Sequence, residues 1–155
     1  MAKRQQPNIG PVSNGTSRTE DLVPAFVWEL KYQRPLKRAH RTLVREIEAR
    51  MEQDGYFESE GASEDCNELL IDALNEYAPE YFYFGASPGD GAAYGYWLGE
   101  DWREALEDDG GIVVDDLASI PKEHVGNVAV VNDHGNVTLY RRSGNHHLYQ
   151  IWSVV

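Results

Sequence analysis

The stretch that most constrains the fold is the last thirty residues of the chain, GNVAVVNDHGNVTLYRRSGNHHLYQIWSVV. β-Branched, aromatic and aliphatic residues, which suit a pleated and half-buried surface, occur there in three runs. The runs are separated by Asn132–Asn136 and Ser143–His146, whose residues accept turn conformations. The pattern predicts a three-stranded antiparallel meander that ends at the last residue. Because a sheet of this kind buries one face, earlier parts of the chain must cover it.

Two helices are predicted upstream. The first begins at Pro35, whose fixed φ suits a first helical turn, and ends near Asp54–Gly55. Its apolar positions recur at intervals of three and four: Leu36, His40, Leu43, Val44, Ile47 and Met51. The second is capped by Ser63 and ends at Pro79. Its stripe is Cys66, Leu69, Leu70, Ala73, Leu74 and Tyr77, which makes Cys66 a small buried hydrophobe.

The remaining segments complete an α+β fold. Residues 1–20 are expected to form a disordered tail, and residues 21–155 a single domain. Leu22–Tyr32 is predicted as an edge strand with Pro24 near its start. Further predicted strands are Tyr81–Phe84, Tyr94–Leu98 and Ile112–Val114, with a short helix capped by Asp101 between the last two. The expected fold is two amphipathic helices packed on an antiparallel sheet that ends in the C-terminal meander.

The cellular location of the protein is predicted from its apolar runs, its N-terminal residues and its cysteine content. No apolar run reaches the roughly 20 residues of a membrane helix. The N-terminus lacks the apolar core of a secretory signal. The lone cysteine is typical of a reducing compartment, so a cytoplasmic protein is expected, with no membrane partner.

Charge is unevenly distributed along the chain. Residues 1–54 carry ten Lys and Arg against seven Asp and Glu, a net charge of +3. Residues 55–155 carry four against nineteen, a net charge of −15. Such a field repels nucleic-acid phosphate and anionic lipid, and it favours a basic protein partner. Solubility alone is the alternative explanation of this charge.

The first predicted helix also carries a basic ridge, formed by Arg34, Lys37, Arg38, Arg41 and Arg45. Taken alone, a ridge of this kind suits contacts to phosphate. Since the rest of the chain is strongly acidic, the ridge equally suits internal or solvated charge.

Two loops contain residues that are also found in catalytic or phosphate-binding sites. In the loop Asn132–Asn136, the residues Asp133, His134 and Asn136 suit either a tight turn or a general base with its orienting group, with Asp90 and His124 as further contributors. The glycine-rich loop 85–92 lacks the Lys-Ser/Thr of a phosphate-binding loop, and Asp90–Gly91 is predicted as its turn. No spacing typical of a metal site occurs, and no cofactor is implied.

Aromatic residues crowd into positions 81–102, and some must face outward if they lie on a strand. Exposed Tyr and Trp are favoured anchors at protein interfaces. Combined with the acidic residues that follow, they predict a partner-binding surface of Tyr94, Tyr96, Trp97, Glu100, Asp101, Trp102, Glu104, Asp108 and Asp109.

The segment FGASPGDGAAYGYW and the string VNDHGNVTLY resemble those of small phage and bacterial proteins for which no activity is established. More distantly, the first segment looks like the SUKH group (SMI1/KNR4), whose members commonly act as immunity proteins that bind and neutralise toxins. The first resemblance implies kinship and no mechanism, and the second implies a protein that binds a partner protein. We expect a non-enzymatic protein encoded by a phage or mobile element.

The expected function is therefore an acidic interaction protein that modulates or inhibits a basic host protein, such as a nucleic-acid-binding one, without touching nucleic acid itself. The alternative is a small hydrolase or metal-dependent enzyme built on Asp133, His134 and Asn136.

Overall fold

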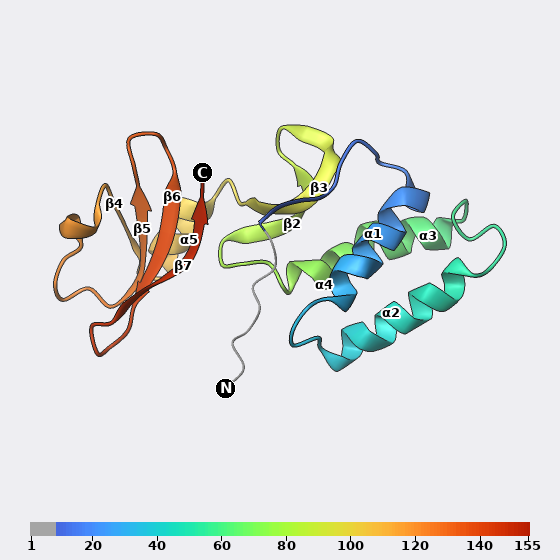
Figure 1. Ribbon diagram of the computed structural model, residues 1–155, viewed down its shortest axis with the longest axis horizontal. Coiled ribbons are helices and arrows are strands. Elements are labelled where there is room, and N and C mark those ends of the chain that lie inside the picture. The colour runs from blue at the N-terminus through green and yellow to red at the C-terminus, as the bar shows by residue number, and fades with distance from the viewer. Residues whose placement is uncertain (1–8) are drawn as a thin grey trace. The chain divides into compact units, whose positions relative to one another are not determined.

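The chain divides into two compact units, Met1–Leu98 and Gly99–Val155, where the sequence led us to expect one domain from residue 21 onward (Figure 1). The computed structural model describes residues 9–155. Both units combine helices with a sheet, and the α+β class predicted from the sequence is confirmed. No helix among the described residues is long and apolar enough to span a bilayer.

The first unit contains a three-stranded antiparallel sheet and a group of helices. Its elements are β1 (Gly10–Ser13), α1 (Thr19–Lys31), α2 (Arg38–Met51), α3 (Glu60–Glu64), the π-helix η1 (Asp65–Leu70), α4 (Ile71–Asn75), β2 (Phe82–Ser87) and β3 (Asp90–Leu98). The strands lie in the order β1-β3-β2. Helices α3, η1 and α4 follow one another without a break, and we call residues 60–75 the composite helix.

The predicted disordered tail is wrong for part of its length. Residues 10–13 form β1, which pairs with β3 so that Pro11 lies opposite Gly95. The backbones come so close that a Cβ at Gly95 would lie 2.1 Å from the carbonyl oxygen of Gly10. A glycine in the partner strand thus provides the room in which β1 docks. Residues 1–8 lie outside the described part of the chain.

The predicted edge strand at Leu22–Tyr32 is also wrong, because this segment is helix α1. Its buried residues are Leu22, Val23, Phe26, Val27 and Leu30, a 3–4 spacing that belongs to a helix. Pro24 lies inside the helix, and Trp28 and Tyr32 lie on its exposed side with ring centroids 4.8 Å apart. Because nearly every position of this segment is apolar, the helical period of its buried residues is not apparent in the sequence.

Helix α1 is the centre of the first unit's core. It packs against α2, η1 and α4, and Phe26 meets Phe84 of β2 edge to face with ring centroids 5.1 Å apart. Phe84 in turn contacts Tyr96 of β3. The core cluster therefore joins the helices to the sheet of β1, β2 and β3. The helices of the first unit thus pack on the sheet of their own unit.

The second unit contains the meander. Strands β5 (Gly126–Val131), β6 (Val137–Arg142) and β7 (Leu148–Val154) are antiparallel neighbours, as predicted. Strand β4 (Ile112–Val114) extends the sheet at the other side of β5 and runs parallel to it. Helix α5 (Trp102–Asp108) precedes β4, and the short helix η2 (Leu117–Ser119) lies between β4 and β5 in the sequence. The side chain of Asp101, predicted to cap α5, makes no capping hydrogen bond to it.

Candidate functional site

The composite helix has an unusual period. Its buried residues Ala62, Cys66, Leu70 and Leu74 are spaced by four throughout. In an α-helix, four residues turn about 40° past a full circle, so such a stripe would wind away from the core. The π-helix η1 lies in the middle of the stripe, and each of its residues turns the chain less than an α-helical residue does. The π-helix therefore keeps this buried series on one side.

The π-helix η1 also aligns a series of carboxylates. Glu60, Glu64, Glu68, Asp72 and Glu76 also recur at intervals of four, and all five are exposed. We call these five residues the acidic row. Because η1 removes most of the drift that an α-helix would add, the row stays on one side of the composite helix and continues to Glu76, just after α4.

Most of the acidic row is electrostatically unsatisfied. Glu76 receives a hydrogen bond of 2.8 Å from Lys37 Nζ. Within residues 9–155, the other four carboxylates take part in no ion pair with Lys or Arg. Like charges four residues apart on a helix destabilise it by roughly 0.2–0.5 kcal/mol per pair. The row thus costs on the order of 1 kcal/mol that a partner's cations would recover.

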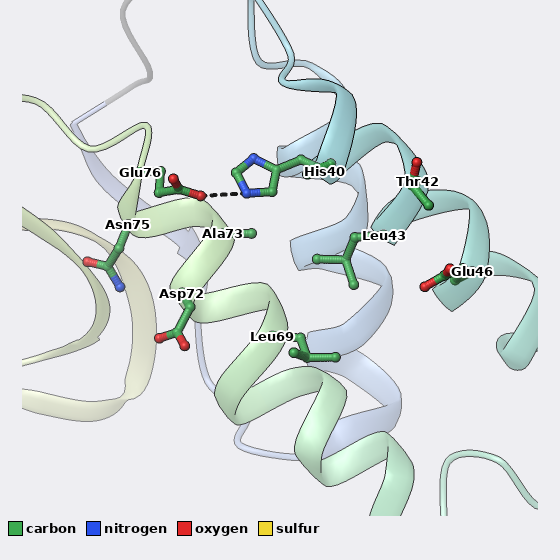
Figure 2. A pocket seen from close by; sticks show the side chains of 10 residues that line it. His40, Thr42, Leu43, Glu46, Leu69, Asp72, Ala73, Asn75 and Glu76 are labelled. Atoms are coloured by element: carbon green, nitrogen blue, oxygen red, sulfur yellow. Dashed lines mark ion pairs between the residues drawn. The ribbon is translucent and has the colours of Figure 1, made fainter.

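A groove lies beside the row, between α2 and the composite helix (Figure 2). Its volume is about 740 Å³. Figure 2 shows Leu43 of α2 and Leu69 of η1 between the two helices. Leu69 is 45% exposed although it belongs to the predicted apolar stripe. The lining is completed by Ala39, His40, Thr42, Glu46, Asp72, Ala73, Asn75 and Glu76. We call this space the α2 groove.

One end of the α2 groove is closed by His40 and Glu76, which form an ion pair through His40 Nε2. On its other side, His40 Nδ1 lies 2.7 Å from the hydroxyl of Tyr77. That hydroxyl accepts a hydrogen bond from the backbone N–H of Lys37, so its own hydrogen is free to reach Nδ1. The arrangement places an imidazole hydrogen on Nε2, toward Glu76.

Further along α2, in the direction away from His40, a second ion pair ties the same two walls together. Arg50 donates to both oxygens of Asp65, which also accepts a hydrogen bond of 2.8 Å from the Tyr56 hydroxyl. Asp65 is buried, and it is the first residue of η1. Burial and the bond to Asp65 raise the pKa of Tyr56. The two ion pairs fix the spacing of the walls.

Two titratable groups of this region, Glu76 and Cys66, each keep one charge state near neutral pH. The hydrogen bond from Lys37, helped by His40, lowers the pKa of Glu76, so this carboxylate stays charged. Burial raises the pKa of the Cys66 thiol to about 11, which keeps it protonated and unreactive. Among the described residues, no three His, Cys, Asp or Glu side chains are grouped closely enough to hold a metal ion.

The members of the predicted partner-binding surface are divided between the two units, and one of its aromatic residues is buried. Tyr96 is fully buried, and its hydroxyl donates to Glu29 at 3.1 Å, so its assignment to an interface is wrong. Tyr94 is half-buried against the core, and Trp97 Nε1 donates to the Gly85 carbonyl. Trp102 is half-buried, with Arg103 over its ring. The acidic members Glu100, Asp101, Glu104, Asp108 and Asp109 are exposed in the second unit.

The loop Asn132–Asn136 is the turn between β5 and β6. The side-chain oxygen of Asn132 accepts hydrogen bonds from the backbone N–H groups of His134 and Asn136. Gly135 has a φ of 80°, which suits glycine. Asp133 and His134 are exposed to solvent, and Asn136 is half-buried. The side chains that an enzyme would need to converge are therefore spread along an exposed hairpin.

The further contributors to that alternative, His124 and Asp90, have hydrogen-bond partners of their own. His124 precedes β5, whereas Asp133 and His134 follow it, so the six residues of β5 separate them by roughly 20 Å. His124 Nε2 instead pairs with the Asn127 carbonyl at 3.0 Å. Asp90 belongs to the first unit, where its side chain accepts a hydrogen bond from the backbone N–H of Ala92.

The glycine-rich loop is a plain hairpin. Residues 82–87 and 90–98 are strands, so the turn is formed by Pro88–Gly89 and not by Asp90–Gly91 as predicted. Gly85 pairs with Gly95 across the hairpin. A loop whose residues are used in strand pairing offers no cradle for phosphate.

The basic ridge of α2 is exposed, but not all of it is free for phosphate. Lys37 is held by Glu76, and the guanidinium of Arg34 donates to the carbonyls of Lys31 and Gln33. Arg38, Arg41 and Arg45 are exposed on α2.

Sequence reasoning missed the acidic row and the α2 groove. The four-residue spacing from Glu60 to Glu76 is visible in the sequence, and it was the available signal. Comparisons with protein families, with curated proteins and with solved structures found no match to this chain.

Proposed function

We propose that this chain is a non-enzymatic interaction protein that binds a basic protein and modulates or inhibits it. The acidic row carries the proposal: five exposed carboxylates, kept in line by a π-helix, with one Lys partner at one end among residues 9–155. Natural helices usually alternate charges at this spacing, since like charges repel. The repulsion within the row raises the free energy of the unbound protein, and a bound cationic surface lowers it.

The distribution of charge supports the same proposal. No Lys or Arg occurs between Gly55 and Leu98, so the composite helix has no cation of its own. A negative field of this kind attracts basic proteins over distances up to the Debye length, about 8–10 Å in ordinary salt. Nucleic acid and anionic membrane are repelled by it. We place this activity in a reducing compartment, the cytoplasm, since Cys66 is the lone cysteine.

The test compares two variants that lose the same charge. One neutralises the row by Glu60→Gln, Glu64→Gln, Glu68→Gln and Asp72→Asn. The other neutralises four exposed acids of the second unit by Glu104→Gln, Glu107→Gln, Asp108→Asn and Asp115→Asn. A partner is captured from host lysate with the wild-type chain, identified and purified, and its Kd is measured for all three proteins in low and high salt.

We expect the row variant to bind at least about tenfold more weakly and to lose most of its salt dependence, because it no longer offers charge to the partner. The second variant should bind within about twofold of wild type. The proposal is wrong if both variants bind like wild type. If only the second variant is weakened, the partner binds the acidic surface of α5. A third variant, His134→Ala, should behave like wild type, and loss of a measurable activity through it would favour the enzyme.

A further inference from the structure

We infer that the α2 groove receives one amphipathic α-helix of the basic partner, with apolar side chains against Leu43 and Leu69 and Lys or Arg side chains beside the acidic row. This inference rests on the function proposed above and names the form of the partner segment. It is carried by the groove itself, which is open, mainly apolar in its middle and bounded by carboxylates, with Asp72 and Glu76 on one wall and Glu46 on the other.

The length of the groove sets the length of the occupant. The residues that line the groove run from Ala39 to Glu46 on α2, and from Leu69 of the composite helix to Glu76 just after it. At 1.5 Å per residue either stretch is about 10 Å long, which corresponds to roughly eight residues, or two turns, of a bound helix. Such a helix presents three apolar anchors, at positions i, i+3 or i+4, and i+7.

The lining explains why a helix fits there. Ala39 and Ala73 are small and lie on opposite walls, so they leave room near the His40 end. Leu69 is an exposed apolar side chain in a region otherwise rich in carboxylates. Both walls are helices and the lining contains no strand edge, so the occupant contributes side chains and not a backbone ladder.

Charge determines how the occupant lies. The composite helix carries the acidic row, and Glu46 adds a carboxylate on the α2 wall. Beyond that wall, the exposed side of α2 carries Arg38, Arg41 and Arg45. A bound helix with cations on the flank that faces Asp72 gains attraction, whereas cations on the other flank meet these arginines. The occupant is therefore basic along one flank and binds in one direction.

The test uses a displayed library of random peptides of roughly 14 residues, selected on the full chain at about 0.1 M salt. We expect enriched peptides to be basic and to place apolar residues at spacings of three and four. One enriched peptide is synthesised with a fluorescent label, together with a version of the same composition whose apolar spacing is scrambled. Their Kd values are measured by fluorescence anisotropy.

Two groove variants and one matched control are compared. Leu69→Ser removes the exposed anchor, and Ala39→Trp fills the groove at a solvent-exposed position. Leu117→Ser removes an equally exposed leucine from the second unit. We expect the two groove variants to weaken binding of the peptide at least about fivefold, with the control unchanged, and the scrambled peptide to bind at least about fivefold more weakly than the selected one.

The outcomes separate the two proposals. If the row variant described above abolishes binding but the groove variants and the scrambled peptide bind like their references, the proposed function stands and the helix-binding groove is wrong. If the row variant binds the selected peptide like wild type, the role of the row in the proposed function is wrong. If the library yields no basic peptide with helical spacing, the inference is overturned.

Discussion

Arg50 and Asp65 form a two-point ion pair between α2 and the composite helix. Arg50 Nε donates to Asp65 Oδ2 at 2.9 Å, and Arg50 Nη2 donates to Oδ1 at 3.0 Å. The contact joins α2 to the first residue of the π-helix, so it fixes the wall of the groove where the helical geometry changes. The Asp65 side chain is nearly buried, while Arg50 is about one-third exposed.

Arg50→Met should destabilise the first unit by about 2 kcal/mol, because it leaves a buried carboxylate with Tyr56 as its remaining hydrogen-bond donor. The exposure of Arg50 keeps the loss below that of a fully buried pair. Hydrogen exchange of α2 and η1 amides measures the change within this unit. Arg45→Met, at an exposed position of the same helix, is the control and should change protection little.

Gly95→Ala should detach β1 from the sheet. The added Cβ would lie 2.1 Å from the Gly10 carbonyl oxygen and 2.7 Å from the Pro11 Cα, and both are backbone atoms that cannot rotate away. We expect a loss of about 2 kcal/mol or more in unfolding free energy, with amides of residues 10–13 exchanging first. Gly91→Ala in the same strand meets nothing within 4 Å and is the matched control. Equal protection of β1 in both variants would contradict the close approach.

The stability of the first unit should fall as pH rises above about 10. Burial, with the nearby carboxylate of Asp65 or Glu29, raises the folded-state pKa of Tyr56 and Tyr96 above the ordinary value of 10.0. Above pH 10 the unfolded chain loses these protons while the folded chain retains them, so the stabilisation present at lower pH is lost.

Unfolding free energies measured between about pH 8 and 11 test this expectation. Tyr96→Phe should reduce the slope above pH 10, since it removes one of the two buried tyrosines. The Cys66 thiol, whose pKa is raised from 9.0 to about 11 by burial, adds a slope that begins near pH 9 in both proteins. Tyr149→Phe changes an exposed tyrosine of the second unit and should leave the slope as in wild type. A slope unaffected by Tyr96→Phe would show that the buried hydroxyl is not its source.

The Cys66 thiol should resist modification in the folded protein. It is 1% exposed, and burial raises its pKa to about 11, so the reactive thiolate is scarce at neutral pH. Reaction with an aromatic disulfide reagent should proceed at the rate at which the composite helix opens, and fully in denaturant. Arg50→Met should speed the reaction, because it weakens the contact beside η1. Rapid labelling of the native wild-type chain would contradict the burial.

Much of the second unit could be predicted from the sequence. The turn residues of Asn132–Asn136 and Ser143–His146 separate the strands, and alternating apolar residues then place β5, β6 and β7. The turn residues and the apolar alternation are both local signals, so they can be recognised without knowledge of the rest of the molecule. The parallel partner β4 was predicted as a strand, but its pairing depends on a crossover that no local pattern encodes.

The first unit was harder for a physical reason. Tyr96 lies on a strand whose aromatic residues alternate, and only the position of α1 decides which of them is covered. Helix α1 was itself misread, because its apolar run conceals the helical period around Pro24. The groove depends on how α2 and the composite helix are held apart by long-range ion pairs, and such pairs join residues 15 or more positions apart.

The π-helix gives the composite helix a tolerance of length. Without one residue of 65–70, this stretch could wind as an α-helix, and five α-helical residues turn about 500° where six π-helical residues turn about 490°. Leu74 would then stay in the interior, and Asp72 and Glu76 would stay on the side of Glu60 and Glu64. We therefore expect the loss of one residue from this stretch to leave the rest of the first unit folded.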